Sequence, residues 1–454
     1  MGIGASAGGL DAYKNLLRSL PTDTGAAFVL VQHLDPNHES LMADLLARHT
    51  RMEVKQAEDD MHLQRNTVYV IPPGKFLRLI DHGLFLDEPV KEKGIRLAVD
   101  YFFRSMAEVR GERSIGIVLS GTGSDGTLGI QEIKAAGGMV MVQDPSDAEY
   151  DGMPRSAMNT GNVDFVLPVS DMGEKLSQFM AHPYLAPKES ASGLSDVDPT
   201  NFNSVLAMLR RYTDYDFNSY KKGTVERRVQ RRMGLKQIEN LADYVAYMRE
   251  RPDEVNQLFR DLLIGVTRFF REPEAWESCG SEVVRRLVER KPKDEPIRAW
   301  VPGCASGEEA YTLAMTIFDE FDRVNRRADV QVFATDLNSH AIEAARAGKY
   351  PKSIEADVPA ATLRKYFTDT GDAYSVNKRL RETIVFAQQN VISDPPFSKL
   401  DIITCRNLMI YLESDVQQRM IEMFHFALAE GGFLFLGNSE TAERPGRLFE
   451  ALDK

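Results

Sequence analysis

Residues 1–9 are Met-Gly-Ile-Gly-Ala-Ser-Ala-Gly-Gly, in which Ser6 is surrounded by small residues at the end of a short apolar run. Three structures fit this stretch. Residues 4–8 match G-x-S-x-G, the sharp strand-to-helix turn that exposes a reactive serine hydroxyl. Residues 2–7 also match a relaxed dinucleotide fingerprint, in which glycines let the backbone approach a pyrophosphate. The third possibility is a glycine-rich turn that only connects two elements.

The composition is that of an ordinary globular protein. The chain has 454 residues, of which 43% are hydrophobic and 27% charged, with a formal net charge of -12. This length exceeds one core and predicts two or three domains. No apolar run is long enough to span a membrane and no signal peptide is recognisable, so we expect a cytoplasmic protein without membrane insertion. The negative charge argues against general nucleic-acid binding.

The cysteines and histidines predict neither a disulfide framework nor a metal site. Cys279, Cys304 and Cys405 are odd in number and widely spaced, which indicates buried thiols in a reducing compartment. The histidines other than His33 lack the spacing of metal ligands.

The first 170 residues alternate short apolar runs with stretches of helical periodicity. This alternation predicts an α/β domain with a largely parallel sheet, in which Ser6 would lie at the ligand-binding carboxyl edge. The expected strands are 26–31, 68–71, 115–119 and 139–142, and the expected helices are 41–49, 97–109 and 127–136.

The rest of the chain divides by composition. Proline, serine and glycine accumulate towards residue 199, which predicts a linker. A helical stretch rich in arginine, leucine and tyrosine follows, and then a second α/β pattern. We therefore expect an α/β domain at 1–172, a linker at 173–198, a small all-α domain at 199–272 and a Rossmann-like α/β domain at 273–454.

Two further residues fall at the same predicted sheet edge as Ser6. A serine nucleophile needs a base and a group that orients the base. His33 follows strand 26–31, and Asp125 lies in Ser-Gly-Thr-Gly-Ser-Asp-Gly at 120–126. The order Ser, His, Asp differs from that of α/β-hydrolases. The dinucleotide alternative weakens, because the second strand ends in Gln-His, although Asp35 just beyond keeps it open.

These motifs resemble the catalytic domain of the chemotaxis methylesterase CheB. The matching stretches are 4–9, 31–33, 121–126 and 152–157. The resemblance implies hydrolysis of glutamate methyl esters on chemoreceptors, with Ser6 as nucleophile, His33 as general base and Asp125 as its orienting carboxylate. Thr122 stands where the family usually has methionine, a departure close to the expected oxyanion site.

A second set of strand ends predicts a nucleotide-like site. Pro-Gly-Cys-Ala-Ser-Gly-Glu-Glu at 302–309 lies between strand 297–301 and a helix at 310–318. The next strand, 330–334, leads to Asp336, where such folds bind ribose hydroxyls. Strands 384–387 and 400–404 lead to 389–391 and 405–407. The glycine spacing favours an adenosyl cofactor over NAD.

One motif in this region suggests a different chemistry. Asp-Pro-Pro-Phe at 394–397 is similar to a motif of amino-methylating nucleic-acid enzymes. It precedes the strand at 400–404, whereas that motif follows a strand. A proline turn entering the strand is the better interpretation.

Residues 199–454 resemble the chemotaxis receptor methyltransferase CheR. The matching stretches are 220–222, 227–228, 269–272, 307–309, 335–336, 405–407, 410–411 and 437–440. Gly265 departs from the asparagine that is frequent in the family. Because a glutamate carboxylate is already nucleophilic, methyl transfer to it needs positioning and desolvation rather than a base. The resemblance implies that Arg271 and Tyr411 lie nearest the methyl group and that S-adenosylmethionine is held by Thr267, Arg271, Glu308, Asp336, Asn390, Val391, Arg406 and Asn407.

A basic run within this acidic chain predicts a docking surface. Six basic residues fall in 221–232, and Arg227, Arg228, Arg231 and Arg232 share one helical face. A solvated face is the ordinary explanation. Docking on acidic chemoreceptor helices is favoured here, because a positive face would steer that encounter.

The whole sequence predicts a fusion of two opposing activities on glutamate side chains. One alternative is a non-catalytic or weakly active sensory scaffold, the N-terminal part of a larger signalling protein. Another is a serine hydrolase for small esters with an unrelated methyltransferase attached. No receiver domain precedes residue 1, so we expect regulation through a partner response regulator, or a chain that is a fragment.

Overall fold

The computed structural model describes residues 1–32, 41–89, 97–185, 199–263, 265–442 and 448–453. The chain forms two compact units. The first comprises residues 1–212, 226–258 and 351–356, and the second comprises residues 213–225, 259–350 and 357–454. Each unit is built around a parallel sheet, which confirms the α/β class expected from the sequence.

The first unit contains a seven-stranded sheet in which every neighbouring pair is parallel. Strand β1 (Gly2–Ala5) lies between β2 (Ala27–Gln32) and β8 (Ile115–Val118). The order continues through β9 (Met139–Gln143) and β10 (Phe165–Leu167) on one side, and through β5 (Thr67–Val70) and β3 (Glu53–Gln56) on the other. The four strands predicted in this region are therefore confirmed.

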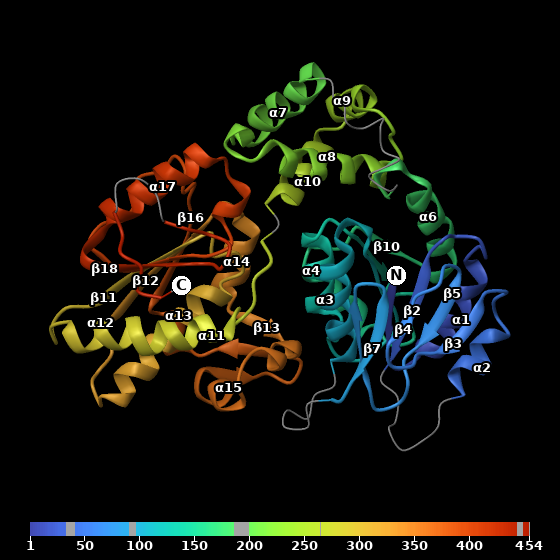
Figure 1. Ribbon diagram of the computed structural model, residues 1–454, viewed down its shortest axis with the longest axis horizontal. Helices are drawn as coiled ribbons and strands as arrows, with labels where there is room; N and C mark the ends of the chain where they lie inside the picture. The colour runs from blue at the N-terminus through green and yellow to red at the C-terminus, as the bar shows by residue number, and fades with distance from the viewer. Residues whose placement is uncertain (33–40, 90–96, 186–198, 264, 443–447, 454) are drawn as a thin grey trace. The chain divides into compact units, whose positions relative to one another are not determined.

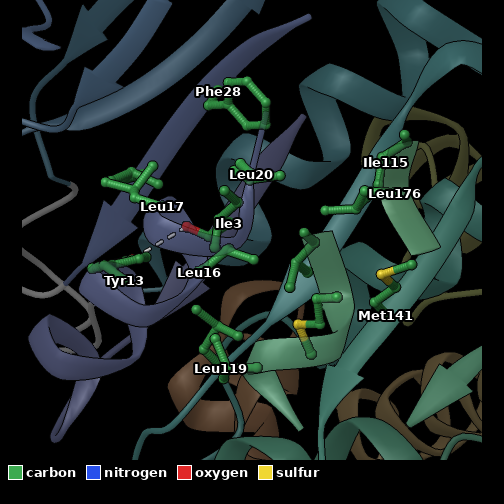
Figure 2. Close-up of a cluster of buried hydrophobic side chains, with 14 of the residues drawn as sticks. Ile3, Tyr13, Leu16, Leu17, Leu20, Phe28, Ile115, Leu119, Met141 and Leu176 are labelled. Carbon is green, nitrogen blue, oxygen red and sulfur yellow. Dashed lines mark hydrogen bonds between the residues drawn. The ribbon is translucent and has the colours of Figure 1, made fainter. Parts of the chain in front are cut away.

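Helices cover both faces of this sheet (Figure 1). Alternate residues of a strand point to opposite faces, so Phe28 and Val29 belong to two different apolar clusters. Figure 2 shows the cluster that contains Phe28, where the Tyr13 hydroxyl donates a hydrogen bond to the carbonyl of Ile3 (3.2 Å). One cluster includes side chains of α1 (Gly9–Ser19), α2 (Met42–Ala47) and α6 (Val169–Ala181), and the other of α3 (Ala98–Arg110), α4 (Thr127–Ala135) and α5 (Gly152–Met158).

Two features of the first unit differ from the sequence expectation. Part of the segment expected as a linker, 173–181, belongs to helix α6, because Leu176 and Phe179 pack into the core of the first sheet. A short 3-10 turn, η3 (Pro183–Leu185), follows it. An antiparallel sheet of β4 (Met61–His62), β7 (Gly83–Asp87) and β6 (Phe76–Ile80) was not expected.

The stretch between the sheets is helical, as predicted. The helices are α7 (Pro199–Thr213), α8 (Lys222–Lys236), α9 (Leu241–Glu250), α10 (Pro252–Leu262), α11 (Pro273–Ser278) and α12 (Arg285–Arg290), with a π-helical turn η5 (Cys279–Val284) between the last two. Residues 226–236 of α8 belong to the first unit.

The second unit contains a five-stranded parallel sheet with the order β16-β12-β11-β17-β18. Four of these strands were predicted; the strand at its edge, β18, and a small three-stranded sheet were not. The strands are β16 (Ile384–Gln388), β12 (Val330–Asp336), β11 (Ile297–Pro302), β17 (Leu400–Cys405) and β18 (Leu428–Leu436), and the small sheet is β13 (Lys349–Pro351), β15 (Ala373–Val376) and β14 (Phe367–Asp369). The helices are α13 (Glu308–Arg323), α14 (Ser339–Ala347), α15 (Ala360–Tyr366), α16 (Lys378–Arg381) and α17 (Ser414–Ala427).

Within the part of the chain that the structure describes, no helix combines the length and apolarity needed to cross a membrane. Among the same residues, no group of three or more His, Cys, Asp or Glu side chains could hold a metal ion. Cys279, Cys304 and Cys405 are free and buried, as expected. Burial raises the pKa of all three thiols, that of Cys279 to about 12.

Candidate active sites

Ser6 lies in the turn between β1 and α1, at the carboxyl edge of the first sheet. Its N–H donates to the carbonyl of Ser120 (3.0 Å), and its own carbonyl accepts the N–H of Gly9 (2.9 Å). Gly8, which precedes α1, has a φ of 71°, a left-handed conformation that strongly favours glycine. The small residues of this stretch therefore produce the sharp strand-to-helix turn that the sequence predicted.

The loop that follows β8 lies directly against Ser6. A Cβ atom added to Gly121 would be 3.0 Å from the Cβ of Ser6 and 2.1 Å from the Sδ of Met153. No side chain fits at position 121, so the loop backbone approaches the serine closely. The structure thus brings Ser6 and loop 120–126 to one edge of the sheet. Thr122 of this loop is exposed.

Asp125 is buried in the same loop, with 4% of its surface exposed. Its carboxylate accepts the N–H groups of Val99 (2.9 Å) and Asp100 (2.8 Å), in the first turn of α3. These bonds fix the carboxylate in place and satisfy two helix-terminal donors. His33 lies outside the described residues, so the relation of Asp125 to His33 stays a prediction.

The second site begins at the turn between β11 and α13. Gly303, Ala305 and Gly307 all have positive φ values, 68°, 45° and 96°. The Asp336 carboxylate, at the end of β12, accepts the N–H of Ala305 (2.8 Å) and the N–H of Asn338 (2.8 Å). Burial raises the pKa of Asp336. The glycine-rich turn and the acidic strand end are therefore in contact, as predicted.

Two adjacent glutamates start helix α13, and burial raises the pKa of each to about 7. The Ser306 hydroxyl donates to both carboxylate oxygens of Glu308 (3.0 and 2.7 Å). The Oε1 of Glu309 is buried and has no hydrogen-bond partner among the described residues. The charge of Arg406, the hydroxyl of Thr404 and the charge of Arg271 act against burial and lower the pKa of Glu309. Glu309 is a further candidate for cofactor binding. It belongs to the 307–309 motif, but the sequence alone did not assign it a role.

Arg406, just after β17, joins two segments that are far apart in the sequence. It donates to the carbonyl of Arg271 (3.0 Å) and to the carboxylate of Glu272. Its guanidinium also lies over the ring of Phe435, 4.7 Å from the centroid. The side chain of Arg271 bonds within its own segment, to the carbonyl of Val266 (2.9 Å).

Two further segments lie close to the glycine-rich turn and Asp336. They are residues 389–391, where the N–H of Gln389 donates to the carbonyl of Asp336 (3.1 Å), and the segment that leads to Thr267. The side-chain Oδ1 of Asn390 accepts a hydrogen bond from the N–H of Ile392 (3.0 Å). The backbone N–H of Asn390 donates to the carboxylate of Asp394 (2.8 Å). Asp394 thus stabilises a turn that enters β17. Val391 packs against the apolar cluster that contains Trp300. A Cβ on Gly265 would be 2.9 Å from that of Ala305, so the segment leading to Thr267 approaches the glycine-rich turn.

Tyr411 is partly exposed (37%), and its carbonyl accepts the N–H of Lys221 (2.9 Å). Tyr220 forms a β-bridge with Leu412. Burial raises the pKa of Tyr220, and the charge of Asp336 raises it further. Tyr220 therefore lies against the segment that carries Tyr411, a placement that the sequence alone did not predict.

The basic face of α8 is not the exposed surface that the sequence predicted. Arg231 and Arg232 are buried, with 0% and 6% of their surfaces exposed. Arg232 forms an ion pair with Glu254 (2.7 Å), and Arg228 donates to the carbonyls of Lys134 and Ala135. Arg227 is the exposed one of the four. The expectation of a four-arginine docking face is wrong, because three of these side chains pair with groups that are distant in sequence.

Three family models match consecutive parts of the chain. Residues 1–176 match the CheB methylesterase model. Residues 200–263 match the all-alpha domain of the CheR methyltransferase, and residues 265–453 match its SAM binding domain.

Individual relatives agree with these matches. An uncharacterized 104.1 kDa protein of Rhodobacter capsulatus is 40% identical over 88% of this chain, which spans 44% of that protein. Chemotaxis protein methyltransferase 2 of Vibrio cholerae is 30% identical over 56% of this chain and 89% of its own length. A protein-glutamate methylesterase/protein-glutamine glutaminase of Carboxydothermus hydrogenoformans is 38% identical over 38% of this chain and 53% of its own length. The chain thus spans about half the length of the first and third relatives.

Proposed function

Because this chain belongs to the CheB methylesterase and CheR methyltransferase families, we propose that it both hydrolyses and forms γ-methyl esters of glutamate side chains on chemoreceptor-like proteins. The observation that carries the proposal is that one chain contains two different sites at strand ends. One consists of Ser6 and loop 120–126, and the other of the turn 302–309 and Asp336. The family matches favour two enzymatic activities over a non-catalytic scaffold. The domain boundaries that we propose are those expected from the sequence, with 173–181 added to the first domain as part of α6.

For ester hydrolysis, Ser6 is the proposed nucleophile. Its hydroxyl oxygen attacks the ester carbonyl while His33 takes the proton and returns it to the departing methanol. Water then attacks the acyl-serine and releases the glutamate carboxylate. Asp125 orients His33 in this proposal. Support comes from the close approach of Gly121 to Ser6, which brings the backbone of loop 120–126 beside the serine, where a developing oxyanion would need N–H donors.

For ester formation, the residues of the second site suit S-adenosylmethionine. The cofactor carries both an ammonium and a sulfonium charge, and buried carboxylates are the matching partners. The chain offers three buried carboxylates here, at Asp336, Glu308 and Glu309, and the Oε1 of Glu309 has no hydrogen-bond partner among the described residues. When bound, the cofactor supplies an electrophilic methyl group. The proposed binding residues are Thr267, Arg271, Glu308, Glu309, Asp336, Asn390, Val391, Arg406 and Asn407.

In this reaction the protein positions the cofactor and the acceptor glutamate and excludes water from them. Arg271 and Tyr411 are proposed to lie nearest the reacting methyl, where an arginine can orient the incoming glutamate carboxylate. Tyr220, whose hydroxyl is kept protonated by burial, can donate a hydrogen bond there without competing as a nucleophile. The acceptor carboxylate needs no base.

Acidic, glutamate-bearing receptor helices are the partners that we propose. Of the four arginines of α8, Arg227 alone remains exposed for such docking within the described structure. If both activities used one substrate without control, they would cancel. The proposal therefore requires either different target residues or regulation that alternates the two sites.

Calorimetry with S-adenosylmethionine and its demethylated product tests the methyltransferase half first. Binding of neither would defeat that half. Ser6→Ala should abolish methanol release from methylated receptor while methyl transfer persists. Asp336→Asn, which keeps one acceptor oxygen for the surrounding N–H groups, should weaken cofactor binding while ester hydrolysis persists. Loss of both activities from either change would contradict independent sites.

A further inference from the structure

Glu440 binds the backbone of two separate segments with one carboxylate. Its Oε1 accepts the N–H groups of Leu408 (2.9 Å) and Met409 (2.7 Å). Its Oε2 accepts those of Asn407 (2.8 Å) and Gly437 (2.9 Å). Bonds from neutral donors to an ionised acceptor are stronger than bonds between neutral groups. Four of them converge on this single side chain.

Three of the four donors belong to the loop that follows β17. This loop carries Arg406 and Asn407 and leads into the 3-10 turn η7 (Met409–Tyr411). Asn407 has a φ of 60°, a left-handed conformation that costs free energy in a residue other than glycine. The loop therefore needs an external group to hold it in this shape, and the Glu440 carboxylate supplies the acceptor.

The second segment is fitted closely to the same loop. A Cβ on Gly437 would lie 3.0 Å from the Oε2 of Glu440 and 3.1 Å from the backbone nitrogen of Asn407. Glycine at 437 thus allows the strand end after β18 and the loop after β17 to come together around the carboxylate.

We propose that Glu440 is a positioning residue for methyl transfer: it fixes the loop that presents Arg406, Asn407 and Tyr411 without touching cofactor or substrate. This inference rests on the proposed methyltransferase function. It goes beyond that function by assigning the geometry of the binding loop to one carboxylate that lies about thirty residues further along the chain.

The test compares Glu440→Gln with Glu422→Gln in the full chain. Glutamine keeps the size of Glu440 but replaces one acceptor oxygen with an NH2 donor, which would face two N–H groups. Glu422 is an exposed carboxylate of α17 that serves as the matched control. Three quantities are measured: amide hydrogen exchange in 406–411, calorimetric cofactor affinity, and kcat and KM of methyl transfer.

We expect Glu440→Gln to speed exchange of the Asn407, Leu408 and Met409 amides at least tenfold without cofactor. Cofactor affinity should fall about tenfold and kcat should fall with it, whereas methylesterase activity, KM for the receptor and all properties of Glu422→Gln should stay close to wild type. Unchanged amide exchange would overturn the proposal. Faster exchange with unchanged cofactor affinity and kcat would also overturn it, because the contact would then be only structural.

A second variant covers the case in which Glu440→Gln does not fold. Gly437→Ala leaves the carboxylate in place and crowds the same junction, so it should shift exchange and affinity in the same direction. A wild-type chain that binds no cofactor would defeat the proposed function and the positioning role with it. A wild-type chain that binds cofactor, together with a Glu440→Gln variant that binds it equally well, would overturn the positioning proposal alone.

Discussion

Arg231 of α8 and Asp164, just before β10, form a buried ion pair, with 2.5 Å between the Nη2 of Arg231 and the Oδ2 of Asp164. Their side chains are 0% and 1% exposed. Lys134 binds the same carboxylate. Arg231 also donates to the carbonyls of Gly137 and Gly138, which follow helix α4. Leu235 of the same helix belongs to the core cluster of the first sheet. Helix α8 of the all-α domain is therefore anchored to the methylesterase domain by a buried ion pair and by core packing.

Removing Arg231 should destabilise the protein strongly. Arg231→Ala removes one cation that pairs with the buried Asp164, and the pairing with Lys134 that remains should keep the cost at or below about 3–5 kcal/mol, the cost of a fully broken buried pair. The free energy of unfolding, measured with urea and followed through methylesterase activity, checks this value. Arg227→Ala, on the exposed side of the same helix, should change it by less than about 0.5 kcal/mol. Equal effects of the two substitutions would show that the buried pair contributes nothing.

Asp125 should matter for stability as well as for catalysis. Asp125→Ala removes the acceptor for two buried N–H groups of α3, and an unsatisfied buried donor costs about 1–3 kcal/mol. Ser6→Ala should abolish ester hydrolysis equally well but leave the free energy of unfolding within about 0.5 kcal/mol of wild type. Urea unfolding of both variants makes the comparison, and an unchanged stability of Asp125→Ala would refute the structural role.

Gly121→Ala should disturb the methylesterase site through two contacts. The added Cβ would meet Met153 at 2.1 Å and Ser6 at 3.0 Å, and overpacking of this kind costs about 1–3 kcal/mol. Adding Met153→Ala removes the closer contact at the cost of a buried side chain, and it should not recover the ester hydrolysis, because the contact with Ser6 remains. Recovery of the ester hydrolysis would mean that the approach to Ser6 is not needed for activity. Thermal unfolding and methanol release are the two measurements.

Glu309 should make stability depend on pH. Its pKa rises from 4.5 in the unfolded chain to about 7 in the folded one, so the folded state binds more protons between these values. The stability from its protonated form is present below about pH 4.5 and is lost as the pH rises through about 7. Glu309→Gln should therefore become more stabilising, relative to wild type, between about pH 5 and about pH 8. Urea unfolding at both pH values tests this, and a pH-independent difference would contradict the raised pKa.

The sequence predicted most of what is buried and periodic. Strands such as β2 and β8 were recognisable because both of their faces are covered, which makes them continuous apolar runs. The hairpin β6–β7 was missed because its two strands have only five residues each, and Arg78 and Ile80 on one face of β6 are exposed. Most of helix α6 was assigned to the linker because prolines and serines accumulate in the residues that follow it.

The sequence predicted those site residues whose positions follow from the ends of parallel strands. Ser6, Asp125 and Asp336 follow parallel strands, and parallel strands end at the same edge. Two features could not be obtained in this way. The burial of Arg231 depends on Asp164 and on the carbonyls of Gly137 and Gly138, which follow α4. The hydrogen bond between Glu440 and the backbone of Asn407 depends on two loops that meet. Spacing within one helix or one motif contains no information about such partners.

Burial of the thiols has a consequence for a chain that handles an electrophile. Cys304 lies in the glycine-rich turn and Cys405 at the end of β17, and burial raises the pKa of each well above its usual value. Towards an activated methyl group a thiolate is a strong nucleophile, whereas a thiol is a poor one. By keeping both sulfurs protonated, the fold would protect the protein from alkylating itself and leave the methyl group for the glutamate of its target.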